Sequence, residues 1–392
     1  MFSGLFRRRE AALEVKSAPP LVALSLTGAP RWGGRDFPAL AREGVMKNAI
    51  VYRAVRMIAE AAASVPWAVY DGAAEVASHP LVDLLRTPNP AEDGVELFVR
   101  WYAFLQSAGN AYLEAACAGG AVRELYVLRP DRVSIVADAN GWPVAYDYKA
   151  GGRTVRIGRG GDGFMPVLHA KLFHPLDDLY GLSPMEAAAM AVDIYNAGAA
   201  WTKSLLDNAA RPSGALIYKG PEGAPNLTDD QFGRLKRELE DAYQGARNAG
   251  RPMVLEGGLD WRSMSHSPAD MDFSDMRAAA AREIALAFGV PPMLLGIPGD
   301  NTYANYREAN LVFWREAVLP LVARTARALT RWLCPGFGGG ALRVFYDADQ
   351  VDALIQERES LWQKIGAADF LSLNEKRAAA GYSPVAGGDA VA

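Results

Sequence analysis

Apolar positions recur every three or four residues in two stretches of the first half of the chain, over 48–65 and over 95–107. That period gives a helix one apolar face, so both stretches are predicted to be amphipathic helices. Pro66 follows the first stretch directly, and the residue before a proline disfavours the helical conformation. The first helix is therefore predicted to end there.

Short runs of strand-forming residues follow the second helix, at 111–116, 125–128, 133–136, 144–148, 154–157 and 167–173. Dipeptides suited to tight turns separate several of these runs, namely Gly119-Gly120, Asn140-Gly141 and Gly151-Gly152. Residues 41–180 are therefore predicted to form an α+β unit with an antiparallel sheet.

Alanine dominates two further helical stretches, 184–208 and 272–288. Ser183 is a candidate N-cap for the first, and only Gly198 interrupts it. At 1.5 Å per residue this predicts one helix about 37 Å long. Small side chains on several faces let neighbouring backbones approach closely, which suits helices wedged among others in an assembly.

A compact insert separates these two helices. It is predicted to contain a strand at 214–219, a charged helix from Thr228 to about Gln244, and two short strands at 253–255 and 259–264. Gly257-Gly258 supplies the turn between those two strands.

The last part of the chain begins with a loop at 296–302. A long helix over 303–333 is predicted to follow, and it should bend at Pro320, whose ring clashes with the preceding turn. A strand at 341–346 and a helical region over 352–381 complete the pattern.

Prolines and glycines interrupt every candidate helix or strand in residues 1–40, which predicts a mobile N-terminal arm. The arm carries Arg7, Arg8 and Arg9. These arginines form a solvated tail or touch phosphate or a partner protein, and the pattern alone leaves that choice open.

Composition narrows the class of protein. The 392 residues allow two or three structural units, and 50% apolar with 22% charged residues suits a chain that buries a core. The net charge of −4 excludes a generally basic nucleic-acid binder. Cys117 and Cys334 are too few for a disulfide scaffold and favour a reducing compartment. No apolar run is long enough for a membrane span, and the N-terminus lacks the apolar segment of a secretory signal.

Catalytic motifs find little support in the sequence. Residues 158–163 match G-x-G-x-x-G, but Pro166 and a strand-like run follow where a nucleotide-binding motif would open a helix. No P-loop is present, and Ser183 lacks the glycine pattern of a nucleophile elbow. No enzyme activity and no cofactor are therefore predicted.

The metal-binding residue types are also poorly placed. The four histidines, at 79, 169, 174 and 266, are scattered, and neither cysteine belongs to a C-x-x-C motif. Asp270, Asp272 and Asp275 lack the glycine of a calcium loop, and carboxylates are expected in a first helical turn anyway. No metal site is predicted.

One stretch is more distinctive, Ile284-Ala285-Leu286-Ala287-Phe288-Gly289-Val290-Pro291-Pro292-Met293-Leu294-Leu295-Gly296. Further short motifs are His79-Pro80-Leu81, Pro88-Asn89-Pro90, Gly109-Asn110-Ala111-Tyr112, Leu128-Arg129-Pro130-Asp131-Arg132-Val133, Tyr180-Gly181-Leu182-Ser183-Pro184, Pro212-Ser213-Gly214 and Leu373-Asn374-Glu375-Lys376-Arg377. In this order, over about residues 45–385, they resemble the portal (head–tail connector) proteins of long-tailed bacteriophages or of phage-derived particles such as gene transfer particles.

The resemblance implies an α+β portal fold with assigned parts: an N-terminal arm 1–40, a wing 41–183, stem helices 184–210 and 267–290, a clip 211–266, a tunnel-loop region 291–303, a long helix and strand 304–346 returning to the wing, and a reduced crown 347–392. It also implies a ring, usually of twelve subunits, at one capsid vertex of a virion assembled in the bacterial cytoplasm. Implied partners are double-stranded DNA, the major capsid protein, the large terminase and a head–tail adaptor, with no membrane.

The charge of the two candidate stem helices fits such a conduit. Seven acids face three bases in 184–208 and 267–289. Because each neutralised phosphate strengthens DNA binding, an acidic channel would let DNA slide. The candidate channel acids are Glu186, Asp193, Asp270, Asp272 and Asp275, and the candidate tunnel-loop residues are Gly299, Asp300, Asn301, Thr302 and Tyr303. The alternative, that individual acids face neighbouring subunits, stays open.

Two other function classes remain as alternatives. A nucleic-acid-processing enzyme would need a P-loop or clustered metal-binding carboxylates, and the sequence contains neither. A ring-forming scaffold or adaptor without a capsid would share the helices, and an axial hole wide enough for duplex DNA distinguishes a portal from it.

Overall fold

The computed structural model describes residues 36–72, 74–207, 214–218, 228–243, 259–263, 273–299, 303–338, 341–380, 382 and 385–390. The chain divides into Met1–Trp32 and Gly33–Ala392, and every described residue belongs to the second unit. Several predictions lie outside the described residues: the Arg7–Arg9 segment, the strand at 253–255 with its Gly257-Gly258 turn, Asp270, Asp272 and the 300–302 segment.

Two helices form the centre of the core, α2 (Ala49–Ala63) and α4 (Gly94–Ala108). Asn48 starts α2 by accepting hydrogen bonds from the backbone N–H groups of Ile50 and Val51. A capping box between Asp93 and Glu96 starts α4. Both helices form as predicted, and their apolar faces pack against each other because that packing removes the apolar surface of both from water.

The helix boundary at the N-terminal side differs from the prediction. Residues Phe37–Leu40 form a short helix, α1, and a π-helical turn over Ala41–Val45 continues it. Asp36 caps this helix through Ala39 N–H, and Leu40 is buried in the core. The prediction of an arm extending to residue 40 is therefore wrong for its last residues, because Leu40 has core to pack against.

The antiparallel strands fall into two sheets rather than one. In the first, β3 (Asn110–Ala118) lies between β4 (Ala121–Leu128) and β8 (Val167–Lys171). In the second, β6 (Pro143–Ala150) lies between β5 (Val133–Ala137) and β7 (Arg153–Gly158). A 3-10 turn at Pro130–Arg132 separates the two sheets along the chain. They meet through one buried cluster, Tyr112, Leu128, Val133, Tyr146 and Val167.

A third sheet joins the two halves of the chain. Strand β1 (Trp67–Asp71) pairs antiparallel with β11 (Leu342–Tyr346) and with β2 (Ala74–Glu75). The sequence pattern predicts β11 but not β1, because the β1 run is short and its partner strand lies near the other end of the chain. The helix α3 (Pro80–Arg86) follows, and His79 Nδ1 caps it by accepting from Leu81 N–H at 3.1 Å.

The helix predicted over 184–208 is divided in the structure. A short α5 (Pro184–Ala187) ends at Ala188, and α6 (Ala189–Asp207) continues from there without a break at Gly198. Met185 of α5 is fully buried against Gly44, where an added Cβ would lie only 2.4 Å from the methionine sulfur. The contact between Met185 and Gly44 thus holds α5 against the core independently of α6.

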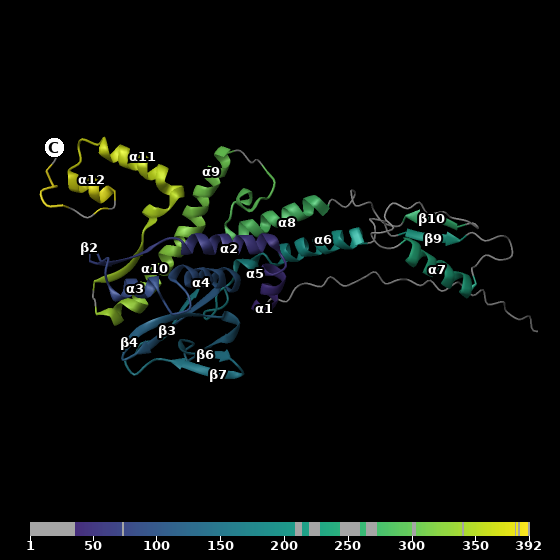
Figure 1. Cartoon of the computed structure of the whole chain (residues 1–392), viewed down its shortest axis with the longest axis horizontal. Coiled ribbons are helices and arrows are strands. Elements are labelled where there is room, and N and C mark those ends of the chain that lie inside the picture. Colours follow the sequence, from purple (N-terminus) through teal and green to yellow (C-terminus); the bar gives the residue numbers. More distant parts are fainter. Residues whose placement is uncertain are drawn as a thin grey trace, which may run out of the picture. The chain divides into compact units, whose positions relative to one another are not determined.

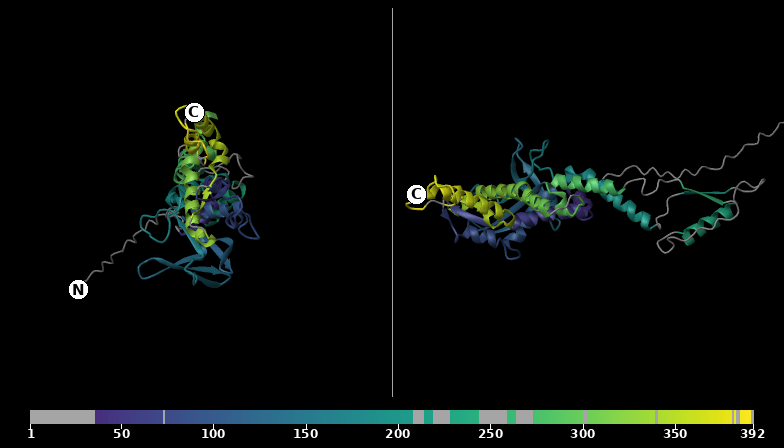
Figure 2. Two further views of the ribbon diagram at one scale, coloured as in Figure 1. Left: turned by 90° about the vertical axis from the view of Figure 1, so that its left-hand side faces the viewer. Right: turned by 90° about the horizontal axis from the view of Figure 1, so that it is seen from above.

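Helix α8 (Phe273–Phe288) confirms the second alanine-rich helix and packs along α6. The two helices run side by side in Figure 1, and the teal and green ribbons of the right-hand view in Figure 2 agree. Between them in the chain, β9 (Gly214–Tyr218) pairs antiparallel with β10 (Leu259–Ser263). Helix α7 (Asp229–Tyr243) begins after Thr228, as predicted, with reciprocal hydrogen bonds between Thr228 and Gln231.

The long helix predicted over 303–333 consists of α9 (Tyr303–Val312), a π-helical turn over Phe313–Val318, and α10 (Leu319–Leu333). The irregular turn comes directly before Pro320, which cannot donate a backbone hydrogen bond to the preceding turn. A π-helical irregularity therefore ends two residues before Pro320, and the bend expected at Pro320 stays a prediction.

The C-terminal region is less continuous than its sequence pattern. Helix α11 (Ile355–Gly366) and helix α12 (Leu373–Ala379) replace the single helical region predicted over 352–381. Ser372 and Glu375 form a capping box, so the chain starts a new helix there instead of extending α11.

Candidate functional site

The contact between α6 and α8 depends on one glycine. A Cβ added at Gly198 would lie 3.0 Å from Cγ of Arg277, tighter than ordinary van der Waals contact. The Arg277 guanidinium lies over the Tyr195 ring, 4.8 Å from its centroid, and its Nη2 donates to the Tyr195 hydroxyl at 3.3 Å. This contact was not predicted, although a lone glycine in an alanine-rich helix is a visible signal of a close approach.

The predicted channel acids that the structure describes lie on three different helices. Glu186 is half-buried in the first turn of α5, Asp193 is half-buried on α6, and Asp275 is exposed in the first turn of α8. They are therefore spread along the helices and not gathered in one cluster. Within the described parts of the chain, no group of three metal-ligand side chains is close enough to hold an ion.

Two of the three bases on these helices make contacts with other groups of the subunit. Arg277 lies over Tyr195, and Arg282 Nη2 donates to the Pro298 carbonyl oxygen at 2.7 Å. Hydrogen bonds to neutral oxygens leave both guanidinium groups charged, so the exposed carboxylate of Asp275 is one of several charged groups on α8.

The segment after α8 folds back onto that helix. Gly289 adopts a left-handed conformation with φ 67°, and Val290 N–H bonds to the Ala285 carbonyl at 2.9 Å. Ile297 is then buried against Ala281 and Ala285. The predicted tunnel-loop region is thus anchored up to residue 298.

Only the two ends of the predicted loop are described. Gly299 is exposed, and Tyr303 is the first residue of α9. The structure therefore shows where Asp300, Asn301 and Thr302 are attached and describes none of the three.

Two of the motifs singled out in the sequence meet in space. Asn110 Oδ1 accepts from Gly181 N–H at 2.8 Å, and an added Cβ on Gly181 would lie 2.2 Å from the Gly109 carbonyl oxygen. Gly109 itself has φ 68°, which favours glycine. The motifs that contain Gly109 and Gly181 therefore allow the backbone at the start of β3 to pack closely against the backbone just before α5.

His169 belongs to the same structural cluster. Its Nε2 is 3.0 Å from Asn110 Oδ1, and its ring stacks on Tyr112 with centroids 4.4 Å apart. Burial, with a smaller contribution from the positive charge of Lys171, lowers the pKa of His169 to about 3. The imidazole is therefore neutral near neutral pH, held by packing.

The motif-like letters at 158–163 form a loop. Gly160 N–H bonds to the Phe164 carbonyl and Gly163 N–H to the Gly160 carbonyl, directly after β7. No helix opens there, so the turn interpretation is confirmed. Ser183 is likewise confirmed as a helix cap, since its Oγ accepts from Glu186 N–H at 3.0 Å.

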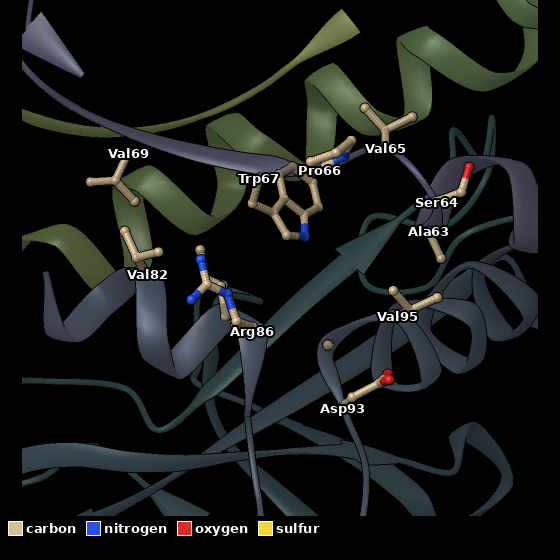
Figure 3. Close-up of a pocket in the computed structure, with 12 residues that line it drawn as sticks. Ala63, Ser64, Val65, Pro66, Trp67, Val69, Val82, Arg86, Asp93 and Val95 are labelled. Atoms are coloured by element: carbon tan, nitrogen blue, oxygen red, sulfur yellow. The ribbon is translucent and has the colours of Figure 1, made fainter. Parts of the chain in front are cut away.

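One cavity of about 330 Å³ lies between the start of β1 and the helices α3 and α4. Figure 3 shows Trp67 and Arg86 close together in it, with Val95 on the α4 side. Asp93 lines the cavity, but its carboxylate already accepts from Glu96 N–H at 2.8 Å as the cap of α4. The cavity is mainly apolar, and its one carboxylate is used in the fold.

Comparison with known proteins places this fold. The family model described as "Phage portal protein" matches residues 49–381. A chain in the neck of an empty gene transfer agent (GTA) particle, computed with C6 symmetry, is 54% identical, with 91% of this chain and 96% of that chain covered and a TM-score of 0.70. The match to the neck of a native GTA particle computed with C12 symmetry is 53% identical, covering 91% and 97%, with a TM-score of 0.69. The portal protein of Enterobacteria phage HK97 is 25% identical over 88% of this chain and 81% of its own length.

The chain belongs to the phage portal protein family, so the resemblance read from the motifs is confirmed. It is a structural portal subunit of a capsid vertex, and its mixed helix-and-strand architecture is that of portal proteins. No described helix has the length and hydropathy needed to cross a bilayer.

Proposed function

We propose that twelve copies of this chain close into a ring at one vertex of a gene-transfer-agent-type particle, and that double-stranded DNA passes through the ring. The observation that carries the proposal is the 53% identity, over nearly the full length of both chains, to a chain in a GTA neck computed with C12 symmetry. A closed ring needs two different faces of each subunit to bind one another.

Exposed apolar side chains on the paired helices support such faces. Leu286 of α8 is 80% exposed and Met190 of α6 is 56% exposed in the single subunit. Because α6 and α8 are the paired helices of the proposed stem, a neighbouring copy that packs on them would cover both side chains.

The assignment of parts follows the same proposal. The region 41–183 with the returning segment 304–346 forms the wing, and 184–210 with 267–290 forms the stem. The clip is 211–266, the tunnel-loop region is 291–303, and 347–392 is a reduced crown. The side-by-side packing of α6 and α8 supports a two-helix stem, and the β9–β10 pair supports a small α/β clip.

The channel role concerns charge. Glu186, Asp193, Asp270, Asp272 and Asp275 give the stem a negative lining, while Gly299, Asp300, Asn301, Thr302 and Tyr303 form the loop that narrows the channel. An acidic lining keeps DNA mobile, because few phosphates find a cation to replace their counterions. The exposed carboxylate of Asp275 in the first turn of α8 supports this role.

The proposed partners are the major capsid protein, the large terminase that drives packaging, and a head–tail adaptor on the clip. The subunit itself contributes geometry and no catalysis. Its place is the capsid vertex of a particle assembled in the bacterial cytoplasm.

Single-particle imaging of the purified full-length chain tests the ring. We expect a closed assembly with twelvefold symmetry and an axial hole wide enough to admit duplex DNA. A chain that stays monomeric at micromolar concentration across a range of salt, or a ring whose centre is closed along its whole length, would contradict the proposal.

A further inference from the structure

A row of basic side chains follows one face of α10. Arg324, Arg327 and Arg331, together with Lys171 of β8, line a cavity of about 420 Å³ between α10 and β8. The lining of this cavity contains no aspartate or glutamate. Four positive groups therefore share one hollow of the surface.

The same row continues on the other side of α10. A second cavity of about 440 Å³, between α10 and β11, is lined again by Arg327 and Arg331 and adds Arg343 and Phe345. The Arg343 guanidinium lies 5.4 Å from the centroid of the Phe345 ring, which is 42% exposed. This lining too has no carboxylate. We call Lys171, Arg324, Arg327, Arg331 and Arg343 the α10 basic row.

Two cations of the row donate hydrogen bonds to carbonyl oxygens and not to carboxylates. Arg324 Nη2 donates to the Lys171 carbonyl, and Lys171 Nζ donates to the Asp178 carbonyl. None of the ion pairs within the described parts of the chain includes a member of the row. Asp177 interacts electrostatically with Lys171, but its carboxylate accepts the backbone N–H groups of Leu179 and Tyr180.

Like charges crowd one another in this row. Burial and the neighbouring charge of Arg327 lower the pKa of the Arg324 guanidinium. Unbalanced positive charges at this spacing repel, and a bound anion relieves that repulsion. The row is therefore arranged for an oxyanion that the subunit itself does not provide.

The spacing of the row indicates which oxyanion. Arg324 and Arg331 are seven residues apart on α10, a rise of about 10.5 Å at 1.5 Å per residue. Three base-pair steps of about 3.4 Å along the axis of a DNA duplex cover about the same length. Arginine forks bind phosphate oxygens two at a time, and a DNA backbone presents such oxygens in series.

We propose that the α10 basic row is a binding surface for the phosphate backbone of duplex DNA, separate from the channel. The proposal goes beyond passage through the ring, because the channel acids let DNA slide whereas this surface holds it. It depends on neither the subunit number nor the stem assignment, so it can fail while the ring proposal stands.

Fluorescence anisotropy with the full-length chain and a short labelled duplex of mixed sequence tests the surface. The variant combines Arg324→Gln, Arg327→Gln and Arg331→Gln. The matched control combines Arg56→Gln, Arg129→Gln and Arg156→Gln, three exposed arginines that pair with carboxylates outside the row. Both variants lose the same charge, so a general electrostatic effect weakens them equally.

We expect the row variant to bind the duplex about tenfold more weakly or worse at low salt, with the control close to the native chain. The slope of log K against log salt should fall by about 0.9 for each phosphate contact removed. Far-UV circular dichroism and assembly size establish that both variants are folded.

Equal affinity and equal salt slope for the native chain and the row variant would overturn the proposal. Equal weakening in the row and control variants would do the same. Poly-glutamate provides a separate arm: if it binds in a row-dependent manner while the duplex does not, the surface serves an acidic protein segment and the DNA assignment is wrong.

Discussion

Asn48 and Asn196 are hydrogen-bonded across two parts of the fold, with Asn48 Nδ2 donating to Asn196 Oδ1 at 3.1 Å. Asn48 is 1% exposed and its Oδ1 caps α2. Asn196 lies on α6, and its own Nδ2 donates to the Glu43 carbonyl at 2.8 Å. One pair of amides therefore ties the start of α2 to the helix that we assign to the stem.

Replacing Asn196 tests that tie. Asn196→Ala should lower the free energy of unfolding by about 1–3 kcal/mol, because it removes the hydrogen-bond partner of Asn48 Nδ2 and of the Glu43 carbonyl oxygen in a part-buried site. Urea denaturation followed by circular dichroism measures the change. The control Gln363→Ala, on the exposed face of α11, should stay within about 0.5 kcal/mol. Equal effects for the two variants would contradict the tie.

Gly198 should tolerate no large side chain. Gly198→Leu forces the added carbons against Arg277 and should cost about 1–3 kcal/mol of stability through overpacking. Gly233 of α7 has open space at its Cβ position, so Gly233→Leu should be neutral or stabilise by up to about 1 kcal/mol through helix propensity. Thermal or urea unfolding of both variants gives the comparison. Similar losses of stability in the two variants would mean that the close approach of α6 and α8 does not restrict the side chain at position 198.

His169 predicts a pH dependence of stability. Its pKa is about 3 in the folded chain, below the ordinary 6.5, so the unfolded chain binds more protons between these values. Stability is therefore full above about pH 6.5 and falls as the pH drops toward 3, by up to about 1.4 kcal/mol per pH unit from this group. Urea denaturation from pH 6.5 downward should show a shallower fall for His169→Gln, which does not titrate. Identical slopes for the two chains would exclude His169 as a source.

Leu286 should be needed for assembly. It is 80% exposed on α8, so Leu286→Arg should leave the subunit folded and prevent the ring by placing a charge in an apolar contact. Mass photometry of the purified chain should then show small species in place of a large assembly. Leu176, 92% exposed in the loop before α5, provides the control Leu176→Arg, which should assemble. If Leu286→Arg still formed a ring, Leu286 of α8 would not be part of the contact between subunits.

Asp275 tests the charge of the channel. Asp275→Lys should reduce the DNA protected in particles more than Asp275→Asn does, because the lysine adds a phosphate contact that slows sliding. Quantitative PCR of nuclease-resistant DNA measures this. Glu359→Lys, on the exposed surface of α11, makes the same charge change elsewhere and should package normally. Normal packaging with Asp275→Lys would remove the support for an acidic lining at this position.

Local signals in the sequence predicted most elements correctly. The cap at Ser183, the start of α7 after Thr228 and the apolar period of α2 and α4 all depend on residues within one or two helical turns of one another. Such interactions are readable because their geometry follows from the helical repeat alone.

Strand pairing was less predictable. Strand β1 is recognisable only through β11, since Val69 is buried opposite Val344 and both need that partner. The division of the predicted sheet into two likewise depends on Tyr112 and Tyr146 packing across a shared core. A period of two indicates a strand but does not name its neighbour.

By itself the sequence determined the family, through ordered motifs, and the local elements, through caps, turns and periods. Only the tertiary structure decided that Lys171 of β8 lies beside Arg324 of α10, and that Gly198 admits Arg277 between α6 and α8. The physical reason is that these contacts join residues far apart in the chain, so they depend on how whole elements pack, and packing is decided by shape and burial over the entire core.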